Sequence, residues 1–407
     1  MKQLFVLVFF LTIISCKKNY THKDLIKEDV AFLADDALKG RATGTEGELT
    51  AAKYIADRFK EMGVDPKGTD GYFQKFTFLP KTDPHKDTEY VTMNSDSTIT
   101  GTNVIGYIDN NAEETIIIGA HFDHLGLGGD GSLHRGDTDI HNGADDNASG
   151  TAVMINLASR LKGKNTNNNF LFMAFSGEEM GLLGSNYFVK NPTIDTKAVN
   201  YMINMDMVGR LKEDKTIAVY GVGTSPRFSQ TLNSLKGDFN LVEKESGVGP
   251  SDHTSFYLSD IPVLHFFTGQ HEDYHKPSDD FDKLNYEGMY AISDYIFNVI
   301  SELNESEKLA FRKTKNESEE VPRFKVGLGV VPDYLYSGKG MRIDGTREDT
   351  PAVKAGLKKG DVVLKLGEHE VTDMMSYMKA LSTFEKGNTT KIVIERNGEK
   401  IEADLTF

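Results

Sequence analysis

The chain has 407 residues, of which 39% are hydrophobic and 26% are charged, and its formal net charge is −15. This length suits two or three domains, and the composition is ordinary for a globular protein. The negative charge argues against nucleic acid as a partner, because phosphate binding needs a basic surface. Cys16 is the only cysteine. A disulfide framework and a thiolate metal site are therefore excluded, and any transition-metal site must use histidine and carboxylate.

Residues 1–16 look like an export signal rather than part of the fold. The apolar run 4–14 is too short to span a bilayer permanently, and it ends at Ser15-Cys16. A small residue before cysteine resembles a bacterial lipoprotein signal, which implies cleavage before Cys16 and lipid attachment to its thiol. The alternative is an ordinary signal peptide with an incidental cysteine. We expect a polar tether over 17–24 and an exported protein, lipid-anchored to a bacterial membrane (the periplasmic or surface face of an outer membrane).

Residues 25–303 have the pattern of one α/β domain. Helices are predicted over 25–41, 45–62, 150–163 and 285–303. Between them lie short apolar runs that predict strands, at 103–108, 115–120, 170–175, 201–205, 217–220 and 263–266. Nearly continuous apolar strands indicate a sheet that is buried on both faces. We therefore predict three layers, with a mixed, mostly parallel sheet between helices on both faces.

The C-terminal part has a different character. Residues 304–321 are charged and poor in apolar residues, which is typical of a linker. Residues 322–407 then predict a small β-rich domain with one helix. Its last two strands flank Asn397-Gly398, a strong signal for a type I′ hairpin turn.

Metal-competent side chains follow four of the apolar runs. In an open sheet, ligands bind beyond the carboxyl ends of parallel strands. These positions hold His121, the pair Glu178-Glu179, Asp206 and His275, and Asp145 lies in a glycine-rich loop between the first two. Four such placements indicate one common site.

The residue types at these positions suit a pair of divalent cations. Histidine and carboxylate ligands without cysteine favour zinc or another first-row metal. Asp123 has the spacing of the carboxylate that usually orients a metal-bound histidine, here His121. The adjacent pair Glu178-Glu179 lets one carboxylate bind metal while the other moves protons. Ser251-Asp252-His253 invites a catalytic-triad interpretation, but adjacent residues rarely face one another productively.

Five motifs occur in the order found in the co-catalytic di-zinc exopeptidases, a family that includes bacterial leucine aminopeptidases, glutamate carboxypeptidase II and glutaminyl cyclases. They are HFDH (121–124), GADDNASG (143–150), SGEEMGLLGS (176–185), MDMVG (205–209) and YHKPSDD (274–280). The resemblance implies the zinc-peptidase, phosphorylase/hydrolase-like fold and two Zn²⁺ per chain.

The same resemblance assigns a role to each residue. His121 and Asp206 would bind one zinc, Glu179 and His275 the other, and Asp145 would bridge both. Glu178 would be the general base, and a cis peptide would join Asp145 to Asp146.

We therefore expect a metallo-aminopeptidase that removes N-terminal residues from peptides. The alternatives are a glutaminyl cyclase or carboxypeptidase on the same metal site, and a non-catalytic lipoprotein that binds peptides through its C-terminal domain. No metal ligand is missing from the motifs, which weighs against the non-catalytic alternative.

The C-terminal domain resembles a PDZ domain, on the residues VGLGV (326–330) and PAVKAGLKKGDVVLKLG (351–367). PDZ domains bind extended peptide ends by strand addition, with loop amides holding the carboxylate. Gly327, Leu328 and Gly329 are the predicted loop, and a peptide C-terminus is the predicted partner. The alternative is a domain that only packs against the catalytic domain.

Overall fold

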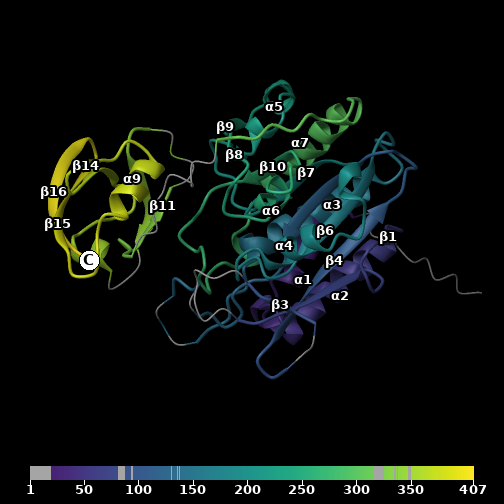
Figure 1. The fold of residues 1–407 in the computed structure, drawn as a ribbon, viewed down its shortest axis with the longest axis horizontal. Helices are drawn as coiled ribbons and strands as arrows, with labels where there is room; N and C mark the ends of the chain where they lie inside the picture. The colour runs from purple at the N-terminus through teal and green to yellow at the C-terminus, as the bar shows by residue number, and fades with distance from the viewer. Residues whose placement is uncertain are drawn as a thin grey trace, which may run out of the picture.

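The computed structural model describes residues 20–80, 88–92, 95–129, 131–134, 136, 138–315, 325–333, 336, 338–346 and 350–407. These residues form two sheets with separate hydrophobic cores (Figure 1). Cys16, the predicted signal peptide and the start of the tether lie outside them. Among the described helices, none has the length and apolar character needed to cross a membrane.

The larger sheet has ten strands in the order β3-β2-β4-β6-β5-β7-β10-β8-β9, with β1 paired to β4. Its four central strands are parallel and wholly buried: β6 (Asn169–Phe175), β5 (Thr115–His121), β7 (Val199–Met205) and β10 (Val263–Phe267). The others are β1 (Asp65–Pro66), β2 (Phe73–Phe78), β3 (Tyr90–Val91), β4 (Ile99–Ile108), β8 (Thr216–Tyr220) and β9 (Asn240–Lys244).

Each apolar run predicted as a strand lies in a strand of this sheet, and the mixed α/β architecture is confirmed. Parallel pairing is narrower than we expected, because it is confined to the four central strands and the pair β8–β9. The pairs β4–β6 and β8–β10 are antiparallel. The parallel centre is the part that positions the site, since its strands end at one edge.

Helices pack on both faces of this sheet (Figure 1). Ile116 and Ile118 of β5 belong to one buried cluster and Ile117 to another, because alternate side chains of a strand point to opposite faces. The first cluster includes residues of α1 (His22–Leu33), α2 (Glu46–Glu61), α3 (Gly150–Leu161), α5 (Phe228–Leu235) and α7 (Tyr286–Asn304). The second includes residues of α4 (Leu183–Lys190) and α6 (His253–Tyr257).

The helix predicted over 25–41 ends at Leu33, and a short turn, η1 (Asp36–Arg41), follows it. Lys39 and Gly40 have φ of 48° and 70°, outside the helical region. A Cβ at Gly40 would lie 2.4 Å from the carbonyl oxygen of His141. The close approach of two backbones therefore requires glycine at this point of the turn.

The first part of the predicted linker differs from the prediction, because 305–315 packs against the domain of the larger sheet. Leu309 is buried in the main core, and its amide donates to Oδ1 of Asn200 at 2.9 Å. The amide of Arg312 donates to the carbonyl of Thr224 at 2.8 Å. The few apolar residues of the segment suffice to hold it. Its remainder, 316–321, lies outside the described residues.

The second sheet belongs to the C-terminal domain, where α8 (Pro351–Lys354) and α9 (Met374–Leu381) accompany the strands. Asn397 and Gly398 both have positive φ, 53° and 84°, between paired strands, so the predicted hairpin is confirmed. The strands are β11 (Val330–Pro332), β12 (Met341–Thr346), β13 (Val362–Leu366), β14 (His369–Glu370), β15 (Thr389–Arg396) and β16 (Glu399–Thr406).

Candidate metal centre

The four central strands bring the predicted side chains to one edge of the sheet. His121 is the last residue of β5, and Asp206 directly follows β7. Glu178 and Glu179 follow β6 after a two-residue turn, and His275 lies in the loop after β10. These side chains therefore meet because their strands are parallel neighbours.

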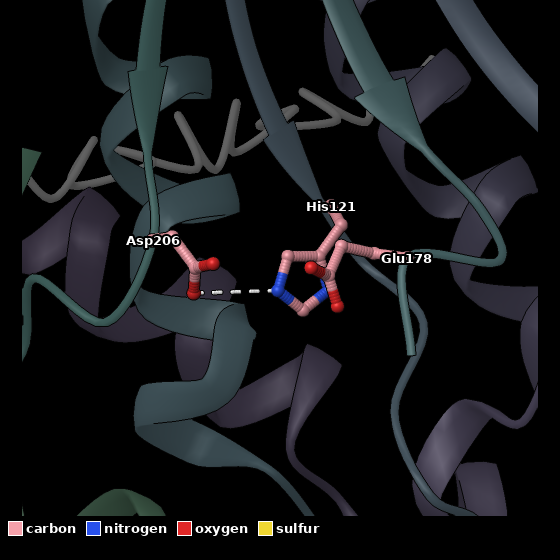
Figure 2. A group of neighbouring side chains, drawn as sticks. All are labelled: His121, Glu178 and Asp206. Carbon is pink, nitrogen blue, oxygen red and sulfur yellow. Dashed lines mark hydrogen bonds and ion pairs between the residues drawn. The ribbon is translucent and has the colours of Figure 1, made fainter. Parts of the chain in front are cut away.

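His121, Asp206 and Glu178 form one half of the site (Figure 2). Nε2 of His121 lies 3.3 Å from Oδ1 of Asp206, the contact that Figure 2 draws as a dashed line. One ligand-competent atom from each of the three residues lies within 4.8 Å of the others. Imidazole nitrogen and carboxylate oxygen at such separations suit a divalent cation.

Asp146 joins this half to a second one. Its Oδ1 lies 3.3 Å from Nε2 of His121, and its Oδ2 lies 3.1 Å from Nε2 of His275. Nε2 of His275 is also 3.3 Å from Oε2 of Glu179. The Asp146 carboxylate therefore faces two separate sets of possible metal ligands. A ligand that is shared between two cations requires this geometry.

The bridging role was predicted for Asp145, and that prediction is wrong. Oδ1 of Asp145 accepts from the amide of Gly209 at 2.6 Å, and its Oδ2 lies 3.1 Å from Nε2 of His271. Its side chain thus points away from the cluster and braces a neighbouring loop. The cis peptide also differs by one position, since it joins Asp146 to Asn147.

Asp123 connects the two predicted partners His121 and Glu178. Nδ1 of His121 lies 3.2 Å from the main-chain oxygen of Asp123 and 3.7 Å from its carboxylate. That carboxylate accepts from the amide of Glu178 at 3.1 Å and from the hydroxyl of Thr43 at 3.1 Å. Asp123 therefore orients the histidine with its backbone and the glutamate with its side chain.

The glycine-rich loop that contains Gly131 and Leu133 also orients one of the metal-competent residues, His275. Nδ1 of His275 lies 2.8 Å from the carbonyl of Gly131. The amide of Leu133 donates to the carbonyl of His275 at 2.9 Å. A hydrogen bond on Nδ1 fixes the ring so that Nε2 faces the cluster. Residue types in this loop could not predict the contact, because backbone groups make it.

The glutamates of the adjacent pair differ in electrostatic environment. Burial raises the pKa of Glu178 well above its usual range, and the carboxylates of Glu179 and Asp206 add to this rise. Burial and Asp146 also favour a higher pKa for Glu179, but the imidazoles of His275 and His124 outweigh them and lower it to about 2. The pair thus combines a permanent anion with a group suited to carry a proton.

The carboxylates open onto a cavity of about 110 Å³. The cavity is lined by the carboxylates of the cluster, by apolar or aromatic side chains and by a few polar ones. They are Asp146, Glu178, Glu179, Asp206, Met207, Tyr220, Pro250, His265, Phe267, Gln270, Tyr274 and His275. No lysine or arginine belongs to this set of described residues. Apart from its two histidines, the described lining therefore offers acceptors and apolar surface.

Ser251, Asp252 and His253 do not form a catalytic triad. Ser251 accepts from Nδ2 of Asn204 at 2.8 Å. The His253 ring stacks on His265 with 4.4 Å between centroids, and its two nitrogens have no hydrogen-bond partner among the described residues. Burial lowers the pKa of His253 well below its usual range. The motif therefore forms buried structure behind the metal-competent cluster.

The predicted peptide-binding loop leads directly into β11. Gly329 has φ of 80°, and a Cβ there would lie 2.2 Å from the Thr350 side chain, so this position requires glycine. Leu328 is buried in the core of the C-terminal domain, whereas a Cβ at Gly327 would meet nothing within 4 Å. The loop thus anchors the side chain of Leu328 and leaves free space beside Gly327.

Solved structures that resemble this fold include a zinc-dependent exopeptidase and an aminopeptidase. The aminopeptidase from Aneurinibacillus sp. strain AM-1 has a TM-score of 0.54 at 19% identity, over 72% of this chain and 95% of that one. A Zn-dependent exopeptidase from Parabacteroides distasonis has a TM-score of 0.56 at 18% identity, over 69% and 97%. At these identities the likeness concerns the fold. The larger domain thus has the fold of the zinc exopeptidases.

Sequence comparison makes the assignment specific. Residues 103–300 match peptidase family M28, and residues 313–407 match the PDZ domain. Just under half of the chain therefore matches peptidase family M28, and its C-terminal part matches the PDZ domain, as the motifs led us to expect.

Two curated relatives match part of this chain. It is 33% identical over 187 residues to the alkaline phosphatase isozyme conversion protein of Escherichia coli, covering 46% of this chain and 51% of that one. It is 30% identical over 190 residues to aminopeptidase YwaD of Bacillus subtilis, covering 41% and 39%. The chain therefore spans about half the length of these relatives, or less.

Proposed function

We propose that the chain is a metal-dependent aminopeptidase that holds two Zn²⁺ ions. The observation that carries the proposal is the Asp146 carboxylate, which faces His121 with one oxygen and His275 with the other. His121 and Asp206 would hold one ion, and His275 and Glu179 the other. Imidazole and carboxylate ligands without sulfur are those that zinc takes in hydrolases.

The residues around this pair divide the reaction between them. Two divalent cations, when bound, supply an activated water and a polarised carbonyl, and their charge favours the ionised form of Glu178. Glu178 accepts the proton of the attacking water on a carboxylate oxygen and gives it to the leaving amine. Asp123 holds the backbone of Glu178 in place through its 3.1 Å hydrogen bond. The enclosed cavity limits bulk water around the carboxylates.

The cavity chemistry favours an aminopeptidase over a carboxypeptidase. A substrate with a free C-terminus would bring a carboxylate, and no lysine or arginine belongs to the described lining to pair with it. A free α-amine is a cation and a donor, and it suits Glu179 together with the side-chain oxygen of Gln270, which is buried without a partner among the described residues. Met207, Tyr220 and Phe267 provide apolar surface, so we propose apolar N-terminal residues as substrates.

A panel of aminoacyl chromogenic substrates tests this function. Turnover of substrates with apolar residues, its loss on chelation and its return with Zn²⁺ would support it. N-terminal glutamine peptides in the same panel test the glutaminyl cyclase alternative by the release of ammonia. Turnover that is absent across the panel would overturn the proposal in favour of a non-catalytic peptide-binding protein. Turnover that survives chelation would overturn the metal requirement.

We also propose that the PDZ domain binds the C-termini of peptides at Gly327, Leu328 and Gly329. The open glycine backbone before β11 supports this proposal, because such loops hold carboxylates through amide N–H groups. Fluorescence titration with peptides that end in a free carboxylate or in an amide tests it. Equal affinity for both forms would contradict it.

From the sequence alone, we propose that Cys16 carries a lipid that anchors the exported protein to a bacterial membrane. Metabolic labelling with a radioactive fatty acid should label the natural chain but not the Cys16→Ser variant. Equal labelling of both would contradict this attachment site.

A further inference from the structure

His124 is a buried histidine in the cluster that the mechanism above does not use. Its exposed fraction is 2%, and its Nδ1 lies 2.7 Å from Oε1 of Glu179. It also belongs, with Asp146 and Glu179, to a group whose ligand-competent atoms lie within 4.8 Å of one another. It therefore either binds a cation itself or acts on a residue that does.

The distances distinguish these two roles. Ligands of one tetrahedral zinc, at bond lengths of about 2.0–2.1 Å, lie about 3.3 Å apart. His275 meets this spacing, since its Nε2 is 3.1 Å from Asp146 and 3.3 Å from Oε2 of Glu179. The 2.7 Å contact of His124 is shorter and is typical of a charge-assisted hydrogen bond. Nδ1 of His124 is also 4.0 Å from Oδ2 of Asp146.

The hydrogen bond fixes which oxygen of Glu179 is free. Two lone pairs 2.7 Å apart would repel, so Nδ1 of His124 must carry the proton and donate it to Oε1. Oε2 is left to face His275. Without the donor, the carboxylate could turn about its last bond and present either oxygen, because that rotation has broad wells.

The backbone around His124 holds its ring in this orientation. A Cβ at Gly143 would lie 2.4 Å from Cγ of His124, so the ring packs directly on the backbone of Gly143, where φ is 55°. Gly143 stands three residues before Asp146, in the loop that supplies the shared carboxylate. The ring thus lies between the loop that carries Asp146 and the side chain of Glu179.

We propose that His124 is a positioning residue that holds Oε1 of Glu179, so that Oε2 alone serves the second cation position with His275 and Asp146. This inference rests on the proposed function. It predicts that the affinity of the second position depends on an N–H donor at the place of Nδ1, and not on an imidazole.

Two substitutions of His124 distinguish the effect of the N–H donor at Nδ1 from the effect of the imidazole ring. In His124→Asn the amide nitrogen takes the place of Nδ1, whereas in His124→Gln it reaches the place of Nε2 and leaves Oε1 of Glu179 without a donor. The exposed His134, in the nearby loop, gives the matched control His134→Asn. The full-length variants are stripped of metal, and zinc affinity is measured by competition with a chromophoric chelator. A denaturant unfolding curve of each metal-free protein verifies its fold.

We expect His124→Asn and His134→Asn to keep both zinc affinities. His124→Gln should keep the first affinity and lose about 10–100-fold in the second, the usual cost of removing a residue that orients a ligand. If His124→Gln keeps both affinities, or if His124→Asn loses as much as His124→Gln, the inference is overturned; the second result would make His124 a ligand. Failure of the natural chain to bind zinc would instead overturn the proposed function.

Discussion

Glu178 and Glu179 are adjacent in the chain, yet their surroundings move their pKa values in opposite directions. The imidazoles of His275 and His124 keep Glu179 anionic, as a ligand must be. At Glu178, burial and the carboxylates of Glu179 and Asp206 raise the pKa and outweigh the opposite effect of the His121 imidazole, which suits a group that alternates between two protonation states. This difference of environment gives each glutamate a separate role.

Glu178→Gln should keep bound zinc and lose most activity. Glutamine preserves the size of the side chain but accepts no proton, and a general base contributes about 10²–10⁴-fold. Elemental analysis and turnover of an aminoacyl chromogenic substrate give the two readings, with the exposed Glu213→Gln as control. Normal turnover by the Glu178 variant would show that the base has been assigned to the wrong residue.

Zinc binding at pH 7 should release at least two protons per chain. Burial lowers the pKa of both His121 and His275, but nearby carboxylates outweigh it, raising that of His121 well above 6.5 and that of His275 to about 11. Both rings are therefore protonated before zinc binds, and a ligating nitrogen must lose its proton. Zinc affinity should consequently rise with pH.

Calorimetric titration in buffers of different ionisation enthalpy measures this release. A binding enthalpy that does not change with the buffer would mean that neither imidazole gives up a proton. The predicted coupling to His121 and His275 would then be wrong.

At the scale of elements, the loops at the sheet edge are joined by one buried side chain. Arg41 is fully buried and donates to the carbonyls of Phe122 at 2.7 Å, Asn142 at 2.6 Å and Gly143 at 3.0 Å. It also donates to Leu33. It thus connects the end of α1 to the loops that carry His121 and Asp146.

Arg41→Lys should lower the free energy of unfolding by several kcal/mol. An ammonium cannot reach all these carbonyls, and each buried acceptor that is left without a donor costs about 1–3 kcal/mol. Urea unfolding measures the change. The exposed Arg227→Lys is the control and should stay within about 0.5 kcal/mol of the natural chain. Equal stability of the two variants would contradict the bracing role of Arg41.

The strands and the edge they share could be predicted because burial on both faces leaves continuous apolar runs. The sequence could not show whether Asp145 or Asp146 is the shared carboxylate, because both stand in the same motif. Only the fold shows which one faces His275. Arg41 was missed because its partners are backbone carbonyls, 81 residues away at Phe122 and 102 at Gly143. Neither the contact of Asp146 with His275 nor the contacts of Arg41 with carbonyls can be predicted from residue type alone.

At the scale of the whole molecule, the peptidase and PDZ domains have separate hydrophobic cores. A chain that ends at residue 315 keeps the segment packed on the catalytic core, including Leu309. It should retain zinc content, thermal stability of the peptidase domain and turnover of aminoacyl chromogenic substrates, since these depend on the first core alone. Loss of turnover with an intact fold would show that the PDZ domain contributes to the catalytic site.

The proposed function depends on the Asp146 carboxylate being shared by two cations. Anomalous diffraction from crystals of the zinc-loaded protein, recorded at the zinc absorption edge, tests it most directly. We predict two peaks, one between Asp146, His121 and Asp206, and one between Asp146, His275 and Glu179. A peak at Asp145, or no peak beside Asp146, would contradict the account.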